Sequence, residues 1–184
     1  ARLFGSLTVR ETVMVALEAR SRSLLIPSLL ALPPSPMAER RKRKEADEII
    51  SYLGLGRYAD SLLSELSTGT RRIVELGALI ALDTKLMLLD EPTAGVAQRE
   101  TEAFGPLIRT IRAELGAAIL IIEHDMPMVM SISDRIYCLE AGRVIAEGVP
   151  AAVRNNPLVI ASYLGTDERA IQRSDTAGAT VTPG

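Results

Sequence analysis

The fold is decided by the stretch Leu86-Met87-Leu88-Leu89-Asp90-Glu91-Pro92, in which an apolar run leads directly into two carboxylates. A continuous apolar run of this length predicts a buried strand of a parallel sheet, here Lys85 to Asp90. Such a strand places Asp90 and Glu91 at the carboxyl edge of the sheet, where open α/β sheets bind ligands. One acid there can orient the hydration shell of Mg²⁺, and the other can polarise a water that attacks phosphorus. The alternative is a strand that ends on two solvated acids.

A second strand is predicted from Ala118 to Glu123, after a helix from about Arg99 to Leu115. Strand, helix and strand at this spacing predict a βαβ unit with parallel strands in one sheet. His124, the only histidine, follows the second strand. Parallel strands end near one another, so we expect His124 beside Asp90 and Glu91, where it could hydrogen-bond a terminal phosphate and the attacking water. A lone histidine is otherwise more often a structural residue.

Upstream, Leu66-Ser67-Thr68-Gly69-Thr70 precedes a helix predicted over residues 69–82. A small-residue loop at a helix N-terminus offers free backbone N–H groups, a hydroxyl and the positive end of the helix dipole. These groups suit an anion such as a phosphate. The alternative is that Ser67 only caps the helix.

Helices also dominate the first third of the chain. One is predicted from Thr8 to about Ala19, because Thr8 and Glu11 have the capping-box spacing. A proline-interrupted stretch, 27–36, separates it from a helix predicted from Met37 to Leu53 and stopped by Gly54. The apolar stripe of that second helix comprises Ile49, Ile50 and Leu53.

A basic run, Arg40 to Lys44, lies on this second helix. We interpret it as a solvated helix face, since acids occur at four-residue spacing from three of its cations. The expected pairs are Glu39 with Arg43, Arg41 with Glu45, and Lys44 with Glu48. The alternative is a patch for lipid headgroups or nucleic acid.

The C-terminal part alternates short elements. We predict a helix over residues 126–133, a hairpin of residues 135–140 and 143–147 that turns at Ala141-Gly142, and two short helices within residues 150–164. Residues 166–184 are polar and lack an apolar period, so we predict a disordered tail.

Composition narrows the class of protein. The 184 residues are 47% hydrophobic, enough for one medium-sized domain. The chain has 21 basic and 23 acidic residues, and because its net charge is therefore −2, nucleic acid is disfavoured as a partner. A single cysteine, Cys138, fits a reducing cytoplasm. The apolar stretch Leu24 to Leu32 is too short to span a bilayer and contains Pro27. The start at Ala1, without methionine or signal core, leads us to expect truncation upstream.

Three motifs resemble, in order and spacing, those of the ABC ATPase family. Leu66 to Thr70 resembles the signature motif, Leu86 to Pro92 resembles the Walker B motif, and Glu123-His124-Asp125 resembles the segment that carries the switch histidine. The resemblance covers about residues 1–164. Within the family, Glu123 to Met126 and Gly142 to Gly148 are most similar to ATP-binding subunits of branched-chain amino-acid uptake systems. The resemblance to the ABC ATPase family implies an α/β fold, with a partial parallel sheet core like that of P-loop NTPases and an all-helical signature subdomain. Residues 1–82 would form that subdomain, 83–165 the catalytic core part, and 166–184 the tail.

The resemblance also implies roles, with ATP and Mg²⁺ as cofactors. Asp90 would help hold Mg²⁺, Glu91 would act as general base, and His124 would contact the γ-phosphate. Ser67, Thr68, Gly69 and Thr70 would form the loop that faces ATP bound by a second ABC ATPase subunit, with Ser67 and Gly69 contacting its γ-phosphate. The helical part would meet transmembrane permease subunits, and a substrate-binding protein would act indirectly. The implied protein is an ATPase on the inner face of the cell membrane that drives import, with branched-chain amino acids as cargo.

This sequence departs from the family pattern. Thr68 and Thr70 stand where the signature most often has glycine and glutamine, and Ala97 stands where an aspartate usually communicates across the dimer. No glycine precedes a lysine, so these residues contain no P-loop. We expect the P-loop and glutamine loop to precede Ala1 and the fragment alone to be inactive. The alternatives are a non-catalytic regulatory or interaction module and a non-transport ABC ATPase, and the coding sequence upstream of Ala1 would discriminate between a clipped enzyme and a degenerate module.

Overall fold

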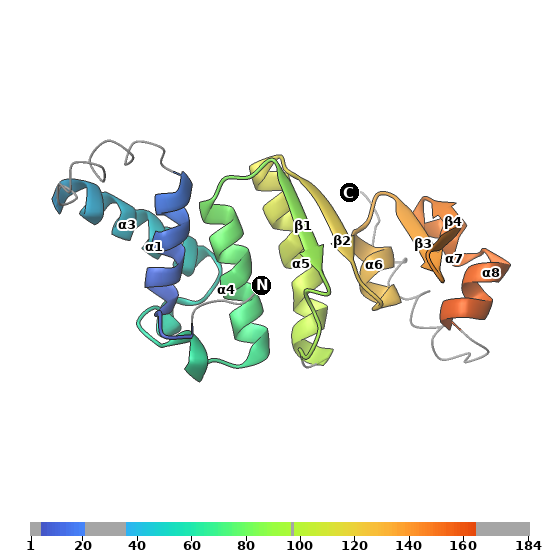
Figure 1. Cartoon of the computed structure of the whole chain (residues 1–184), viewed down its shortest axis with the longest axis horizontal. Helices are drawn as coiled ribbons and strands as arrows, with labels where there is room; N and C mark the ends of the chain where they lie inside the picture. Colours follow the sequence, from blue (N-terminus) through green and yellow to red (C-terminus); the bar gives the residue numbers. More distant parts are fainter. Residues whose placement is uncertain (1–4, 21–35, 97, 165–184) are drawn as a thin grey trace, which may run out of the picture. The chain divides into compact units, whose positions relative to one another are not determined.

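The structure is a computed structural model that describes residues 5–20, 36–96 and 98–164 (Figure 1). The chain forms two compact units. The first comprises Ala1–Leu88, Thr93–Val96 and Ile111–Leu120, and the second comprises Leu89–Pro92, Ala97–Thr110 and Ile121–Gly184. The apolar stretch 24–32, most of the proline-interrupted stretch, Ala97 and the predicted tail lie outside the described residues. Within the described ranges, no helix is both long and apolar enough to cross a membrane.

The first helix, α1 (Val9–Arg20), begins as the capping box predicts. The Glu11 carboxylate accepts hydrogen bonds from the backbone N–H of Thr8 at 2.8 Å and from its hydroxyl at 2.9 Å. The Thr8 hydroxyl oxygen in turn accepts from the backbone N–H of Glu11 at 3.2 Å. These bonds satisfy donors that a helix N-terminus otherwise leaves unpaired, and so they fix the start of the helix.

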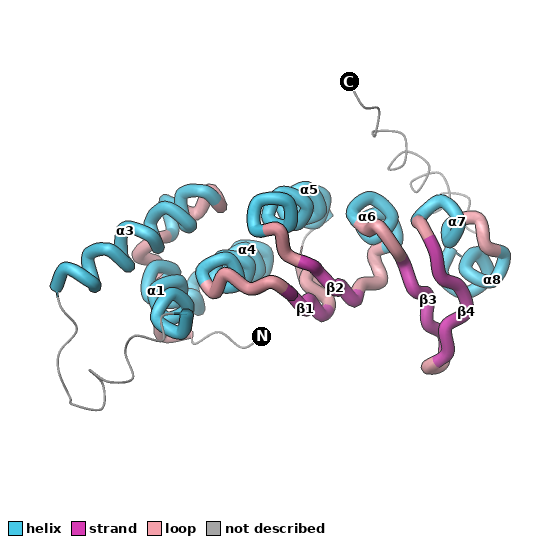
Figure 2. Tube along the Cα trace, turned by 90° about the horizontal axis from the view of Figure 1, so that it is seen from above, coloured by secondary structure: helices cyan, strands magenta, loops and turns pink. Residues whose placement is uncertain are grey.

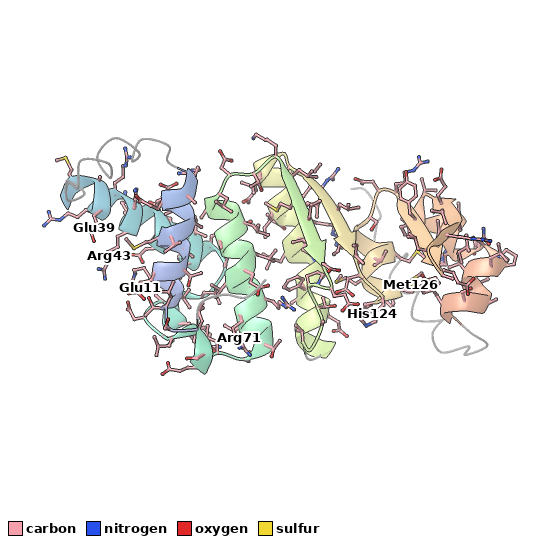
Figure 3. All side chains as sticks on the ribbon, in the orientation of Figure 1. Glu11, Glu39, Arg43, Arg71, His124 and Met126 are labelled. Carbon is pink, nitrogen blue, oxygen red and sulfur yellow. The ribbon has the colours of Figure 1, made fainter. Side chains whose placement is uncertain are left out.

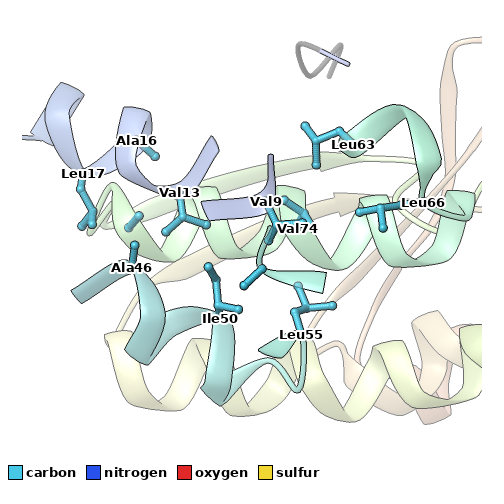
Figure 4. Close-up of a cluster of buried hydrophobic side chains, with 12 residues drawn as sticks. Val9, Val13, Ala16, Leu17, Ala46, Ile50, Leu55, Leu63, Leu66 and Val74 are labelled. Atoms are coloured by element: carbon cyan, nitrogen blue, oxygen red, sulfur yellow. The ribbon is translucent and has the colours of Figure 1, made fainter. Parts of the chain in front are cut away.

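Two further helices complete the core of the first unit. They are α3 (Pro36–Tyr52), which Gly54 follows at φ +69°, and α4 (Thr68–Ala81). Short 3₁₀ turns, η2 (Gly56–Tyr58) and η3 (Leu63–Glu65), connect them. α1 packs against both α3 and α4. Their buried apolar side chains meet in one cluster, shown in Figure 4, which includes Val9, Val13, Leu17, Ala46, Ile50, Leu63 and Val74.

The predicted βαβ unit is confirmed as β1 (Leu86–Asp90), α5 (Gln98–Leu115) and β2 (Ala118–Ile122). β1 pairs with β2. The strands run in the same direction, because the N–H of Ala118 donates to the carbonyl of Lys85 and the N–H of Glu91 donates to the carbonyl of Ile122. Gly116, at φ +57°, ends the helix where the sequence predicts.

The prediction that both strands are buried is wrong for one face of the sheet. Met87 and Leu89 are buried, but Leu88 is 66% exposed. Strand side chains alternate between faces, so one face of β1 is packed and no described residue covers the other. The large apolar side chains exposed on these two strands are Leu86, Leu88, Leu120 and Ile122.

The second unit has its own core. It contains α6 (Met126–Ile132), β3 (Ile136–Glu140), β4 (Arg143–Gly148), α7 (Pro150–Arg154) and α8 (Pro157–Val159), which continues into a π-helical turn, η4 (Ile160–Leu164). Figure 2 shows β3 and β4 side by side, and α7 and α8 both contact β4. Cys138 is buried in this core. The hairpin turns at Ala141 (φ +47°) and Gly142 (φ +77°), as a turn with two left-handed residues requires.

The ion pairs of α3 differ in part from the predicted ones. Lys44 lies 3.7 Å from Glu48, which confirms that pair. Glu45 instead pairs with Arg20 of α1, because α1 packs along α3 and supplies a partner from outside the helix. Neither Arg41 nor Arg43 forms an ion pair within the described part of the chain. The prediction of local pairs for these two arginines is therefore wrong.

Candidate functional site

The acid pair lies where β1 ends. Asp90 is the last residue of the strand, and its side chain is exposed. Glu91 has φ +44°, in the left-handed region that non-glycine residues rarely adopt. Its N–H nevertheless donates to the carbonyl of Ile122 at 2.8 Å, so pairing with β2 holds this conformation. The change of backbone conformation between the two residues lets adjacent carboxylates point in different directions, and nothing in the sequence marks it.

His124, labelled in Figure 3, lies beside Glu91, as the βαβ interpretation predicts. Its Nδ1 is 3.8 Å from Oε1 of Glu91, and the two side chains are 73% and 56% exposed. This separation is longer than a hydrogen bond. Both groups therefore remain accessible to a ligand or a water.

The residues on either side of His124 explain its exposure. The buried Glu123 carboxylate accepts the backbone N–H of His124 at 3.0 Å. Asp125 caps α6, since its carboxylate accepts the N–H of Met128 at 3.0 Å. Because both acidic neighbours are engaged with backbone groups, the sequence Glu-His-Asp fixes the local backbone and leaves the imidazole outside. These two supporting roles were not predicted, although Asp125 immediately before a helix is a recognisable N-cap signal.

The Ser67 loop caps α4, as predicted. The Ser67 oxygen accepts the backbone N–H of Thr70 at 3.2 Å and lies 2.9 Å from the Thr70 hydroxyl. Gly69 is buried, and Thr68 is half-buried. Gly95, in the segment that follows the acid pair, lies close to Thr68, since a methyl group added at Gly95 would lie 3.5 Å from the Thr68 side chain. The loop and this segment belong to the first unit, whereas Asp90, Glu91 and His124 belong to the second.

One of the two possible directions of the Ser67–Thr70 hydroxyl bond leaves the Ser67 proton available. A hydroxyl oxygen has two acceptor positions and one O–H donor. When the Thr70 hydroxyl donates to Ser67, that bond and the Thr70 N–H occupy both acceptor positions. The remaining Ser67 O–H can then only donate. In this orientation the loop presents a hydroxyl donor at a helix N-terminus, in an exposed position suited to an anionic oxygen.

The residues present fit a magnesium ion that is held mainly by phosphates and water. Among the described residues, no group of three or more His, Cys, Asp or Glu side chains could hold a metal. Mg²⁺, however, commonly takes only one or two protein carboxylates and keeps water and substrate phosphates as its other ligands. Asp90, an exposed carboxylate at the strand edge, is a ligand of this kind.

A separate hollow of about 230 Å³ lies within the first unit. Its lining includes Ile49, Ile80 and Ile111. Tyr52 and Glu114 also line it; burial of the Tyr52 hydroxyl and its hydrogen bond to Glu114 raise the pKa of Tyr52. None of the predicted site residues lines this hollow, so it carries none of the expected phosphate chemistry.

Comparison with known proteins is consistent across families, sequences and structures. The family model described as ABC transporter matches residues 1–94, and the model described as branched-chain amino acid ATP-binding cassette transporter matches residues 143–169. The chain is 37% identical over 164 residues to the high-affinity branched-chain amino acid transport ATP-binding protein LivG of Escherichia coli strain K12, covering 89% of this chain and 64% of LivG. The corresponding identity to BraF of Pseudomonas aeruginosa is 34%, with the same coverage.

Solved structures agree. The crystal structure of an ATP-binding cassette of an ABC transporter in its ADP conformation superposes with a TM-score of 0.68 at 28% identity, covering 88% of this chain and 64% of that one. The fold is therefore the mixed α/β fold of ABC ATPase domains. With the family model matching more than half of the residues, the chain belongs to the ABC transporter family. It spans about 64% of the length of the LivG and BraF relatives.

Proposed function

We propose that the chain forms part of the ATP-hydrolysing subunit of an ABC importer, which couples ATP binding and hydrolysis to the transport of branched-chain amino acids. The observation that carries the proposal is the strand edge where Asp90 and Glu91 end β1 and His124 lies 3.8 Å from Glu91. The names of LivG and BraF support the cargo. The complete subunit lies on the inner face of the cell membrane against permease subunits, and the 184 residues alone do not hydrolyse ATP.

The two carboxylates divide the chemistry. Asp90 helps hold Mg²⁺, which neutralises phosphate charge when bound. Glu91, whose left-handed backbone differs from the strand backbone of Asp90, orients a water molecule and accepts a proton from that water during attack on the γ-phosphate. His124 hydrogen-bonds the γ-phosphate and the attacking water from the neighbouring strand end. The exposure of Glu91 and His124 supports these roles, because both side chains are free to turn toward a ligand.

The Ser67 loop acts on a second ATP. Ser67, Thr68, Gly69 and Thr70 face the nucleotide bound by another ABC ATPase subunit, with the Ser67 hydroxyl and the backbone at Gly69 as donors to its γ-phosphate. The contacts of Ser67 support this assignment, since the orientation in which the Thr70 hydroxyl donates to Ser67 leaves the Ser67 proton for an anion. Two subunits arranged head to tail then share each site. ATP binding closes the pair, hydrolysis opens it, and the helical part passes the motion to the permease.

The test of hydrolysis is Glu91→Gln in the full-length protein with its permease subunits. Loss of the general base lowers ATP turnover by about 10²- to 10⁴-fold while ATP binding persists. Glu102→Gln, which removes an exposed carboxylate from α5, is the matched control and retains turnover. Unchanged turnover in Glu91→Gln would contradict the assignment of Glu91 as the general base.

Cargo is tested separately, by uptake of labelled leucine, isoleucine and valine into vesicles that contain the complete transporter and its binding protein. We expect uptake that depends on ATP and is lost in Glu91→Gln. ATP-dependent uptake of another solute, with no uptake of these three, contradicts the cargo and leaves the hydrolytic role intact.

A further inference from the structure

The outer side of α3 carries cations that the fold does not use. Met37, Arg40, Arg41 and Lys44 follow the spacing i, i+3, i+4, i+7, which places them on one face of the helix. We call these four residues the basic face. The opposite side of α3 contributes Ala46 and Ile50 to the core of the first unit. The basic face therefore points away from the packed helices.

Three other charged groups of α3 are engaged with α1. Lys42 pairs with Glu18, Glu45 with Arg20, and Asp47 with Arg10. Arg40 and Arg41, in contrast, form no ion pair within the described part of the chain, and neither does Arg43, an exposed residue of the same helix that is labelled in Figure 3. Lys44 pairs with Glu48 at 3.7 Å with both side chains exposed, and such a pair contributes little. Among the residues that the structure describes, Arg40 and Arg41 therefore stabilise the fold through no ion pair, and Lys44 does so only weakly.

The acids nearby do not neutralise this face. Glu39 and Glu48 are the exposed acids of α3, against the four exposed cations Arg40, Arg41, Arg43 and Lys44. Met37, at the start of the same face, is 83% exposed. An apolar side chain among cations is the composition of helices that lie on anionic bilayers, where cations meet headgroups and apolar groups enter the interface.

We propose that the basic face of α3 docks onto the anionic phospholipid headgroups of a membrane surface. The charge complementarity is specific to the helix, because the chain as a whole has a net charge of −2 and no general attraction to polyanions. Lipid is favoured over nucleic acid by the transporter family to which the chain belongs. The proposal needs none of the roles assigned to Asp90, Glu91 and His124, and it adds a direct lipid contact to the membrane location proposed above.

The experiment measures binding of the full chain to vesicles by flotation. The wild-type protein should bind vesicles that contain phosphatidylglycerol, bind phosphatidylcholine vesicles weakly, and lose binding as salt rises. Each basic residue near an anionic surface strengthens binding about fivefold, so Arg40→Gln with Arg41→Gln should weaken it about 25-fold. Glutamine preserves the helix propensity of arginine.

Two further variants separate charge from folding. Lys85→Gln with Arg143→Gln changes the net charge equally at exposed positions elsewhere and should leave binding within about twofold of the wild type, since only charges near the lipid contribute strongly. Arg40→Lys with Arg41→Lys keeps both charges and should retain binding. Equal binding to neutral and anionic vesicles, or an equal loss in the control variant, overturns the proposal. So does a DNA duplex that binds the wild type more tightly than anionic vesicles and loses affinity in the Arg40→Gln, Arg41→Gln variant.

Discussion

The left-handed backbone of Glu91 makes a prediction about stability that does not depend on catalysis. Glu91 has φ +44°, whereas Asp90, one residue earlier, lies in β1 with ordinary strand geometry. Glycine adopts positive φ without steric cost. Replacing each of the two residues by glycine should therefore have opposite effects on the free energy of unfolding.

The magnitudes follow from two opposing terms. A non-glycine residue in the left-handed region costs about 1–2 kcal/mol, which Glu91→Gly recovers. Glycine also loses about 0.5–1 kcal/mol through the greater freedom of the unfolded chain. The net expectation for Glu91→Gly is a gain of about 0–1.5 kcal/mol. Asp90→Gly recovers nothing and should lose about 0.5–1 kcal/mol, and Glu91→Val should lose about 1 kcal/mol or more because a β-branched residue tolerates positive φ poorly.

Urea denaturation followed by far-ultraviolet circular dichroism measures these differences. The order of stability should be Glu91→Gly, then wild type, then Asp90→Gly and Glu91→Val. If Glu91→Gly is less stable than the wild type by as much as Asp90→Gly, the strand does not end in a left-handed residue in solution. The explanation of how the two carboxylates diverge would then be wrong.

Three further predictions concern the helices and are measured in the same denaturation assay. Ile50→Ala should cost about 2–5 kcal/mol, because the side chain is only 1% exposed in the core of the first unit; a loss below about 1 kcal/mol would contradict that packing. Ser67→Ala should cost about 0.5–2 kcal/mol by removing the α4 cap. Thr70→Val keeps the backbone N–H that Ser67 accepts and should cost less than about 0.5 kcal/mol; equal losses in the two variants would refute this division of roles. Hydrogen bonds from Thr8 lower the pKa of Glu11 below its ordinary value of 4.5, so the unfolded state binds more protons than the folded state. The ionised Glu11 therefore stabilises the fold above pH 4.5, and this stabilisation is lost as the pH falls through the lowered pKa. Glu11→Gln should remove that part of the pH dependence, and an unchanged acid profile would show that the capping box does not form.

Local signals in the sequence were sufficient to predict where the helices and strands lie. The capping box of Thr8 and Glu11 sets the start of α1, and Gly54 and Gly116 mark the ends of α3 and α5. Each of these signals acts through backbone groups within a few residues, which is why they can be read without a tertiary structure. The approach of His124 to Glu91 was also predictable, because parallel strands place their ends at one edge.

Features set by distant contacts could not be predicted in the same way. Glu45 has Arg41 at helical spacing, but it pairs with Arg20 because α1 happens to pack beside it. The apolar run that contains Leu88 has the pattern of a strand covered on both faces, yet one face is exposed. A periodic pattern reports which residues are apolar, and it does not report which other segment covers them. Glu91 gives no sign of its left-handed backbone, because that conformation is imposed by pairing with β2. The roles of the site residues stay predictions until turnover is measured.

The burial of Cys138 has a practical consequence for spectroscopy. Desolvation in the hairpin core raises the pKa of this thiol, and thiol reagents attack the thiolate. Within these 184 residues, labelling of Cys138 by maleimide should therefore be slow compared with labelling of an exposed thiol. A cysteine introduced at an exposed position such as Arg41 would take up a fluorophore or spin label in preference to Cys138. Such a probe would report on its immediate surroundings in lipid and in water from a single attachment point.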